Sequence, residues 1–144
     1  MIVALNMDQK RASFALGQVA WLKEKEEANN IRTQSAKFIA LILNSGFLQA
    51  MDFAGTKLNG AFVILNNWFA EDDKETGPEL SEPIKKAAVN GTLNQKLAEL
   101  DDINEYRRAM QESVAFLGWL KSKAEGKKME LENKQGNHSG NKET

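Results

Sequence analysis

Two pairs of adjacent aspartates are the side chains in this sequence best suited to acid–base or magnesium chemistry. They are Asp72-Asp73 and Asp101-Asp102, and neighbouring carboxylates can transfer protons or hold a hard divalent cation. The first pair lies in AEDDKETGPELSEP, residues 70–83, whose acidic residues and Gly-Pro pair indicate a solvated loop. The second pair stands where a helix is expected to begin, and a carboxylate there stabilises the helix N-terminus. We therefore expect neither pair to form an active site.

Other residue types that carry catalysis are scarce. The sequence has no cysteine, and its one histidine, His138, lies in a polar C-terminal stretch. Thiolate zinc sites, cysteine nucleophiles and disulfides are therefore excluded. The metal motifs Glu-x-x-His and His-Glu-x-x-His do not occur, and neither does a glycine-rich phosphate loop. The sequence predicts a protein that is not an enzyme and that has no metal, cofactor or small-molecule substrate.

The cellular location follows from two further observations. No apolar run approaches the ~18 residues that a membrane span needs. The opening MIVALNMDQK lacks the basic start and the length of a secretory signal. We expect a cytoplasmic protein that has no membrane partner.

Basic side chains remain as candidates, because they could bind the phosphates of a nucleic acid. The net charge is −1, but residues 71–105 carry ten acidic and four basic groups, whereas residues 1–70 and 106–126 each sum to +2. A basic surface is expected where the two cationic segments meet. The candidates for contact with RNA are Lys10, Arg11, Arg32, Lys37, Arg107, Arg108 and Lys121.

Arg11 and Trp119 each break the pattern of their helix. Arg11 lies within the apolar stripe of the first predicted helix. It could extend to solvent, pair with a carboxylate such as Asp52 or Glu112, or meet a phosphate. Trp119 lies opposite the apolar face of residues 105–126. It could fill a second core seam, anchor a contact with another subunit, or stack on a base.

Helical periodicity must position these residues, because sustained period-two alternation is absent. The sequence predicts an all-α, compact single-domain bundle of five to seven helices. Asn6 or Asp8 can cap the first helix, and Asp102 with Glu105 three residues later forms an acidic capping box for the last. The predicted helices cover about 7–28, ending at Asn29-Asn30, then 31–44, 47–57, 58–70, 83–89, 93–100 and 103–126.

The domain organisation follows from the end of the chain. The last helix is expected to stop at Gly126, and the following KKMELENKQGNHSGNKET has almost no apolar residues. Such a segment cannot bury enough surface to offset the loss of chain entropy. We predict a bundle of residues 1–126 and a disordered polar tail of residues 127–144.

Four segments together resemble a known family. They are DQKRASFALGQV near the start, FIALILNSGFLQAMDFAGTK, AFVILNNWF, and YRRAMQESVAFLGWLKSKAEG near the end. In order and spacing they resemble the small helical subunit of the type III-B CRISPR effector complex, the Cmr complex. The similarity covers most of residues 7–125, is weak over 71–100 and does not extend to the tail.

The resemblance implies a non-catalytic subunit, present in several copies, that stacks along the backbone subunits holding the guide RNA and helps to bind target RNA. Its partners would be the backbone and large subunits, other copies of itself, and target and guide RNA. Base pairing reads the target, so the subunit need only offer a sequence-independent basic surface. The matching blocks favour Lys10, Arg11, Arg107 and Arg108 as RNA-facing residues. The alternative is a helical protein–protein scaffold or dimerisation module that does not bind nucleic acid.

Overall fold

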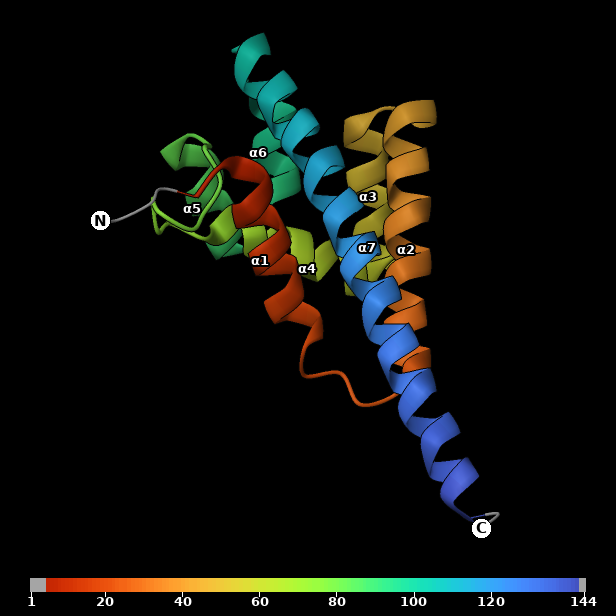
Figure 1. Ribbon diagram of the computed structural model, residues 1–144. Coiled ribbons are helices and arrows are strands. Elements are labelled where there is room, and N and C mark those ends of the chain that lie inside the picture. The colour runs from red at the N-terminus through yellow and green to blue at the C-terminus, as the bar shows by residue number, and fades with distance from the viewer. Residues whose placement is uncertain (1–4, 143–144) are drawn as a thin grey trace, which may run out of the picture.

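A computed structural model of the chain describes residues 5–142, with side chains for residues 5–134. Within this part of the chain there are seven α-helices and no strand, which confirms the all-α bundle. The helices are α1 (Met7–Val19), α2 (Lys25–Ser45), α3 (Phe47–Lys57), α4 (Asn59–Ala70), α5 (Glu82–Asn90), α6 (Leu93–Glu99) and α7 (Ile103–Lys142). In Figure 1, α7 runs the length of the molecule, with α1 on one side and α2 on the other.

Local side-chain contacts cap the first and the last helix, α1 and α7. Asn6 and Gln9 form a reciprocal capping box, with each side-chain oxygen accepting the other residue's backbone N–H at 2.8 and 2.9 Å. Asp102 Oδ1 accepts the N–H of Asn104 at 2.8 Å, just before α7. Gly46 joins α2 to α3 with φ of 97°, a conformation that favours glycine. The predicted cap at Asn6, the predicted cap at Asp102 and the predicted glycine junction are therefore confirmed. The reciprocal bond from Glu105 that a capping box at α7 requires is not found among the described residues.

The predicted end of the first helix is wrong. Helix α1 ends at Val19 instead of Ala28, and Asn29-Asn30 lie inside α2. The connecting residues 20–24 contain neither glycine nor proline. Their turn is instead stabilised by tertiary packing, because the side chain of Leu22 is buried in the core and its N–H donates to Val19 O. Packing of this kind overrides helix propensity.

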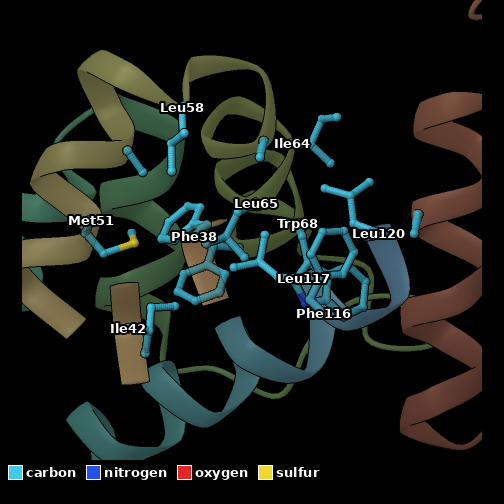
Figure 2. Packing of buried hydrophobic residues seen from close by; sticks show 14 of the residues in the cluster. Phe38, Ile42, Met51, Leu58, Ile64, Leu65, Trp68, Phe116, Leu117 and Leu120 are labelled. Carbon is cyan, nitrogen blue, oxygen red and sulfur yellow. The ribbon is translucent and has the colours of Figure 1, made fainter. Parts of the chain in front are cut away.

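An aromatic cluster joins α1, α4 and α7 in the core. Trp68 of α4 is fully buried, and its ring stacks on Phe116 of α7 with centroids 5.1 Å apart and planes 10° from parallel. Phe14 of α1 packs against both rings. Figure 2 shows Trp68 and Phe116 close together, while Phe38 and Met51 fill the side toward α2 and α3. The three layers of α1, α7 and α2–α4 are thereby held in one core.

The last helix also extends further than predicted, because α7 does not stop at Gly126 and continues to Lys142 over 40 residues. Leu131 is buried, so packing continues beyond Gly126. Lys127 and Lys134 both pair with Glu130, at 3.6 and 3.1 Å, and pairs at these spacings stabilise a helix. The division into a bundle and a disordered tail stays a prediction. The side chain of His138 and residues 143–144 lie outside the described residues.

Replacing Gly126 with alanine tests the course of α7. A Cβ at this position would meet no atom within 4 Å, and glycine in a helix interior costs about 0.5–1 kcal/mol relative to alanine. Gly126→Ala is therefore expected to raise the free energy of unfolding by that amount and to leave the helical circular dichroism signal undiminished. Destabilisation on urea titration would instead indicate that the helix ends at Gly126 in a glycine-specific conformation.

Candidate nucleic-acid interface

Arg107 and Lys121 are exposed on α7 and share one of its faces. Helix geometry places them about 21 Å apart along the axis and within about 40° of each other around it. Arg108 is also exposed but lies about 100° around the helix from Arg107. It lines a separate hollow with Glu79 and Glu105, where carboxylates offset its charge. The two neighbouring arginines therefore have different surroundings: Arg107 shares a face of α7 with Lys121, whereas Arg108 lies beside carboxylates.

Arg32 of α2 and Lys121 of α7 lie at a common hollow of about 410 Å³. Gly118, Ser122 and Glu125 complete its lining. Arg32 Nε lies 2.9 Å from Glu125 Oε2, and Arg32 also donates to Asn29 Oδ1 at 3.2 and 3.4 Å. The hollow thus has two cations and one carboxylate, and it extends the basic face of α7 onto α2.

The remaining lysine candidates lie away from this hollow. Lys37 is exposed on α2. Lys10 of α1 donates from Nζ to the backbone carbonyl of Lys74 at 3.3 Å, so it lies against the acidic connection between α4 and α5. The candidate residues therefore form several groups on the surface instead of one continuous patch.

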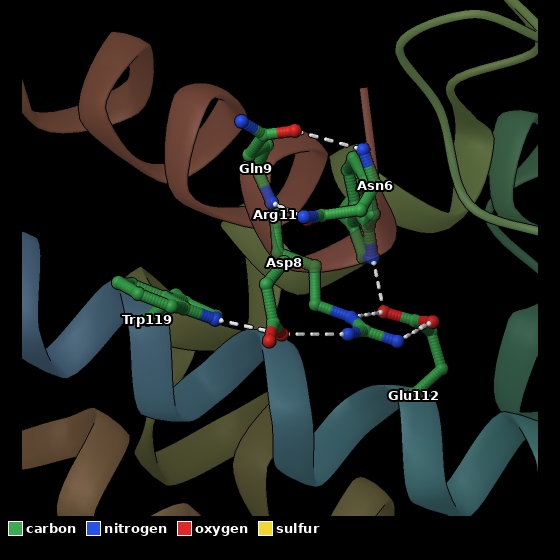
Figure 3. A network of polar contacts seen from close by, with 7 residues as sticks. Asn6, Asp8, Gln9, Arg11, Glu112 and Trp119 are labelled. Atoms are coloured by element: carbon green, nitrogen blue, oxygen red, sulfur yellow. Dashed lines mark hydrogen bonds and ion pairs between the residues drawn. The ribbon is translucent and has the colours of Figure 1, made fainter. Parts of the chain in front are cut away.

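Arg11 is held by carboxylates, the second of the alternatives considered for it. Its Nε and second terminal nitrogen donate to the two oxygens of Glu112 at 2.7 and 2.9 Å, and its other terminal nitrogen donates to Asp8 at 3.0 Å (Figure 3). The Arg11 side chain is only 17% exposed. The hydrogen bonds that Arg11 donates to Glu112 raise the pKa of Arg11 above its ordinary value, and burial opposes this rise. The two segments with net positive charge do meet, where α1 packs on α7. The charge of Arg11 at this contact is neutralised by Glu112 and Asp8.

Glu112 also accepts a hydrogen bond from Trp68 Nε1 at 3.0 Å. Sequence reasoning named Glu112 as a possible partner of Arg11 but missed this indole. The apolar residues around Trp68 in the sequence could have indicated this hydrogen bond, because a buried tryptophan usually finds an acceptor for its N–H. Glu112 therefore links α1, α4 and α7 at one buried carboxylate.

Trp119 is partly buried and packs against the core beside α1. Its Nε1 donates to Asp8 Oδ1 at 3.2 Å, and the Lys123 ammonium lies 5.8 Å from the ring centroid. This contact with α1 explains why an aromatic residue occurs opposite the main apolar face of α7. A role for Trp119 in a subunit interface stays a prediction.

The described part of the chain lacks two other kinds of site. Among residues 5–134, whose side chains the structure describes, no group of three histidine, cysteine or acidic residues is placed to hold a metal ion. No helix within residues 5–142 is both long and apolar enough to span a bilayer.

Comparison with known families gives one match. The model of the family described as CRISPR-associated protein (Cas_Cmr5) matches residues 7–127. Comparison with curated proteins and with solved structures finds no match. The matched range begins with α1 and includes every helix of the bundle up to the middle of α7. This chain therefore belongs to the Cas_Cmr5 family, the small subunits of the Cmr-type (type III-B) CRISPR complex.

Proposed function

We propose that this small subunit binds target RNA through the exposed cations of α7 and α2, as a non-catalytic component of antiviral defence. The observation that carries the proposal is the placement of the exposed Arg107 and Lys121 on one face of α7. Arg32 lies beside Lys121 but is paired with Glu125, so its contribution is secondary. Two or more cations along one line can follow a phosphate backbone. Arg11 is not included, because Glu112 and Asp8 occupy its donors.

The remaining candidates contribute at the edges of this surface. Lys37 and Arg108 are exposed cations on α2 and α7, and Lys10 lies on α1. None of them needs to read bases, since pairing between guide and target supplies the sequence specificity. Such contacts position RNA without discriminating among sequences.

The proposed partners follow from the family. The chain acts in a CRISPR complex with other Cmr subunits. We propose that several copies stack along the guide-RNA-bearing backbone and next to the large subunit, in the cytoplasm, with target RNA lying across the basic face. Membranes and small-molecule substrates have no place in this proposal.

Removing the two α7 cations together should weaken RNA binding by the assembled complex. Arg107→Gln with Lys121→Gln is expected to reduce affinity about tenfold at low salt, since exposed charge contacts contribute up to ~1 kcal/mol each. Two lost phosphate contacts should also flatten the plot of log affinity against log salt by about 1.4. Filter binding of single-stranded target RNA at several salt concentrations measures both quantities.

The matched control changes two exposed lysines elsewhere, Lys57→Gln with Lys86→Gln, which alters net charge equally. The proposal requires the control complex to bind RNA as the wild type does. An equal loss in both double variants would indicate a general charge effect. Unchanged affinity in both, together with unchanged affinity of a complex lacking the subunit, would favour the alternative of a scaffold that binds only protein.

A further inference from the structure

A hollow of about 460 Å³ lies between α3, α4 and α6, on a part of the molecule that the basic face does not include. Its polar lining comes mainly from Thr56, Asn66, Thr92, Asn94 and Gln95. The apolar side chains Phe62, Val63 and Leu93 complete it. Neither the family nor the proposed RNA surface gives this hollow a function.

Each polar side chain named above donates at least one hydrogen bond inside the protein. Thr56 and Thr92 donate their hydroxyl hydrogens to backbone carbonyls at 3.1 and 3.5 Å. Asn66 Nδ2 donates to another backbone carbonyl at 2.9 Å. Gln95 Nε2 donates to a glutamate of its own helix at 3.2 Å. The two hydroxyls have no further hydrogen to donate, Asn66 and Gln95 each keep one N–H group, and the side-chain oxygens remain as acceptors for a ligand.

Asn94 shows the same arrangement most clearly. Its Nδ2 donates to the carbonyl of Met51 at 3.1 Å and to Asp52 Oδ1 at 3.2 Å, and these two bonds define the orientation of the amide. Asn94 Oδ1 is consequently buried and accepts no hydrogen bond within the described residues. An unpaired buried acceptor costs free energy. Because this oxygen is closed to solvent, the acceptors open to a ligand belong to the exposed side chains of the lining, which include Asp52, Thr56 and Gln95.

The charge and apolar surface of the hollow narrow the class of ligand. Asp52 is exposed and is its only charged lining residue, so phosphate and carboxylate ligands would meet repulsion and find few donors. A divalent cation prefers several carboxylates, and the hollow has one. Val63 is 45% exposed at its edge, and the ring of Phe62 is partly exposed. The surface therefore combines acceptors, one negative charge, an aromatic ring and an apolar edge.

We propose that this hollow receives an arginine side chain from another protein subunit of the assembled complex. A guanidinium carries five donors and no acceptor, so it complements a lining that offers several side-chain oxygens and the Asp52 carboxylate. Its planar face can pack on the Phe62 ring while an N–H group reaches the Asp52 carboxylate. Arginine is also enriched among the residues that dominate protein interfaces.

The arginine comes from a different subunit instead of a second copy of this chain. The chain has only four arginines. Arg11 and Arg32 are paired with Glu112 and Glu125. Arg107 and Arg108 belong to the RNA surface proposed above, so this step alone rests on the proposed function. The complementary surface should carry an arginine beside an apolar residue that covers Val63.

Charge reversal at Asp52 tests the proposal in the assembled complex. Asp52→Lys is expected to lower the amount of this subunit that co-purifies with the other Cmr subunits at least tenfold. The control Asp72→Lys makes the same change at an exposed carboxylate outside the hollow and should be retained within twofold of the wild type. Thermal melting of each free chain shows whether it folds.

A milder variant keeps the test decisive if Asp52→Lys does not fold. Asp52→Asn preserves an oxygen for the Asn94 amide and removes only the charge, and a fewfold loss of retention is expected. Retention of a folded Asp52→Lys or of Asp52→Asn at the wild-type level would overturn the proposal. The proposal would also be overturned if light scattering showed that the free wild-type chain self-associates and that Asp52→Asn abolishes this self-association. RNA affinity is a separate measurement, so the RNA surface can fail while the hollow is upheld.

Discussion

Replacing Glu112 with alanine is expected to lower the free energy of unfolding by about 3–5 kcal/mol, because removal of one partner of a buried ion pair leaves the other uncompensated. Glu112 is 7% exposed and accepts two of the three hydrogen bonds that the Arg11 guanidinium donates. The variant would leave Arg11 with only Asp8 and would also remove the acceptor of Trp68 Nε1. The loss therefore combines an unpaired charge with an unpaired indole N–H.

Urea titration followed by circular dichroism measures the effect of Glu112→Ala. The matched control is Glu132→Ala, which removes an exposed glutamate from the same helix and should cause no measurable change. Removing both partners with Arg11→Met and Glu112→Leu should recover about 2 kcal/mol of the single variant's loss, since only Trp68 Nε1 then lacks its partner. A double variant as unstable as Glu112→Ala would show that the ion pair is not the source of the effect.

The three tryptophans should respond to alanine substitution in the order of their burial. Trp68 is fully buried and stacked on Phe116, so Trp68→Ala should cost about 3–5 kcal/mol. Trp119 is partly buried and has one hydrogen bond to Asp8, which predicts a loss of about 1–2 kcal/mol. Trp21 is 68% exposed, so Trp21→Ala should change stability by less than about 0.5 kcal/mol.

This series also addresses the function of Trp119, because the same chemical change is compared at three burials. Thermal and urea unfolding of the free chain give the order. Incorporation into the complex, measured for the folded Trp119→Ala, separates a contact with α1 from a contact with another subunit. A Trp119 variant as destabilising as Trp68→Ala would assign the residue wholly to the core.

Helix ends marked by a characteristic residue, such as glycine, could be predicted from the sequence to within a residue or two. The segment 47–57 was predicted with the bounds that α3 has, because Gly46 marks its beginning. Local signals of this kind require no knowledge of the tertiary structure. The all-α class follows from the same periodicity.

The two wrong helix boundaries have a different origin. The turn after Val19 depends on burial of Leu22, and no local residue type announces it. Gly126 was interpreted as a stop, yet a helix tolerates an isolated glycine at a cost of about 1 kcal/mol. In both cases contacts elsewhere in the chain outweigh a local preference.

The sequence could predict which cations of the candidate site are exposed, but not which carboxylates pair with them. Exposure of Arg107 and Lys121 follows from the pattern of α7. The pairing of Arg11 was left open in the sequence, because its two partners lie three and 101 residues away. Only the packing of α1 on α7 selects Glu112 from the many carboxylates of the chain. The RNA role of each cation stays a prediction.

The continuity of α7 restricts how the length of this chain can change. Each residue inserted between Arg107 and Lys121 would rotate one cation about 100° around the axis relative to the other. One deletion would therefore move Lys121 off the shared face and shift Phe116 or Leu120 out of the core. The connection between α4 and α5, residues 71–81, has no such restriction, since lengthening a surface loop costs little entropy. Insertions and deletions should be tolerated there and not within this part of α7.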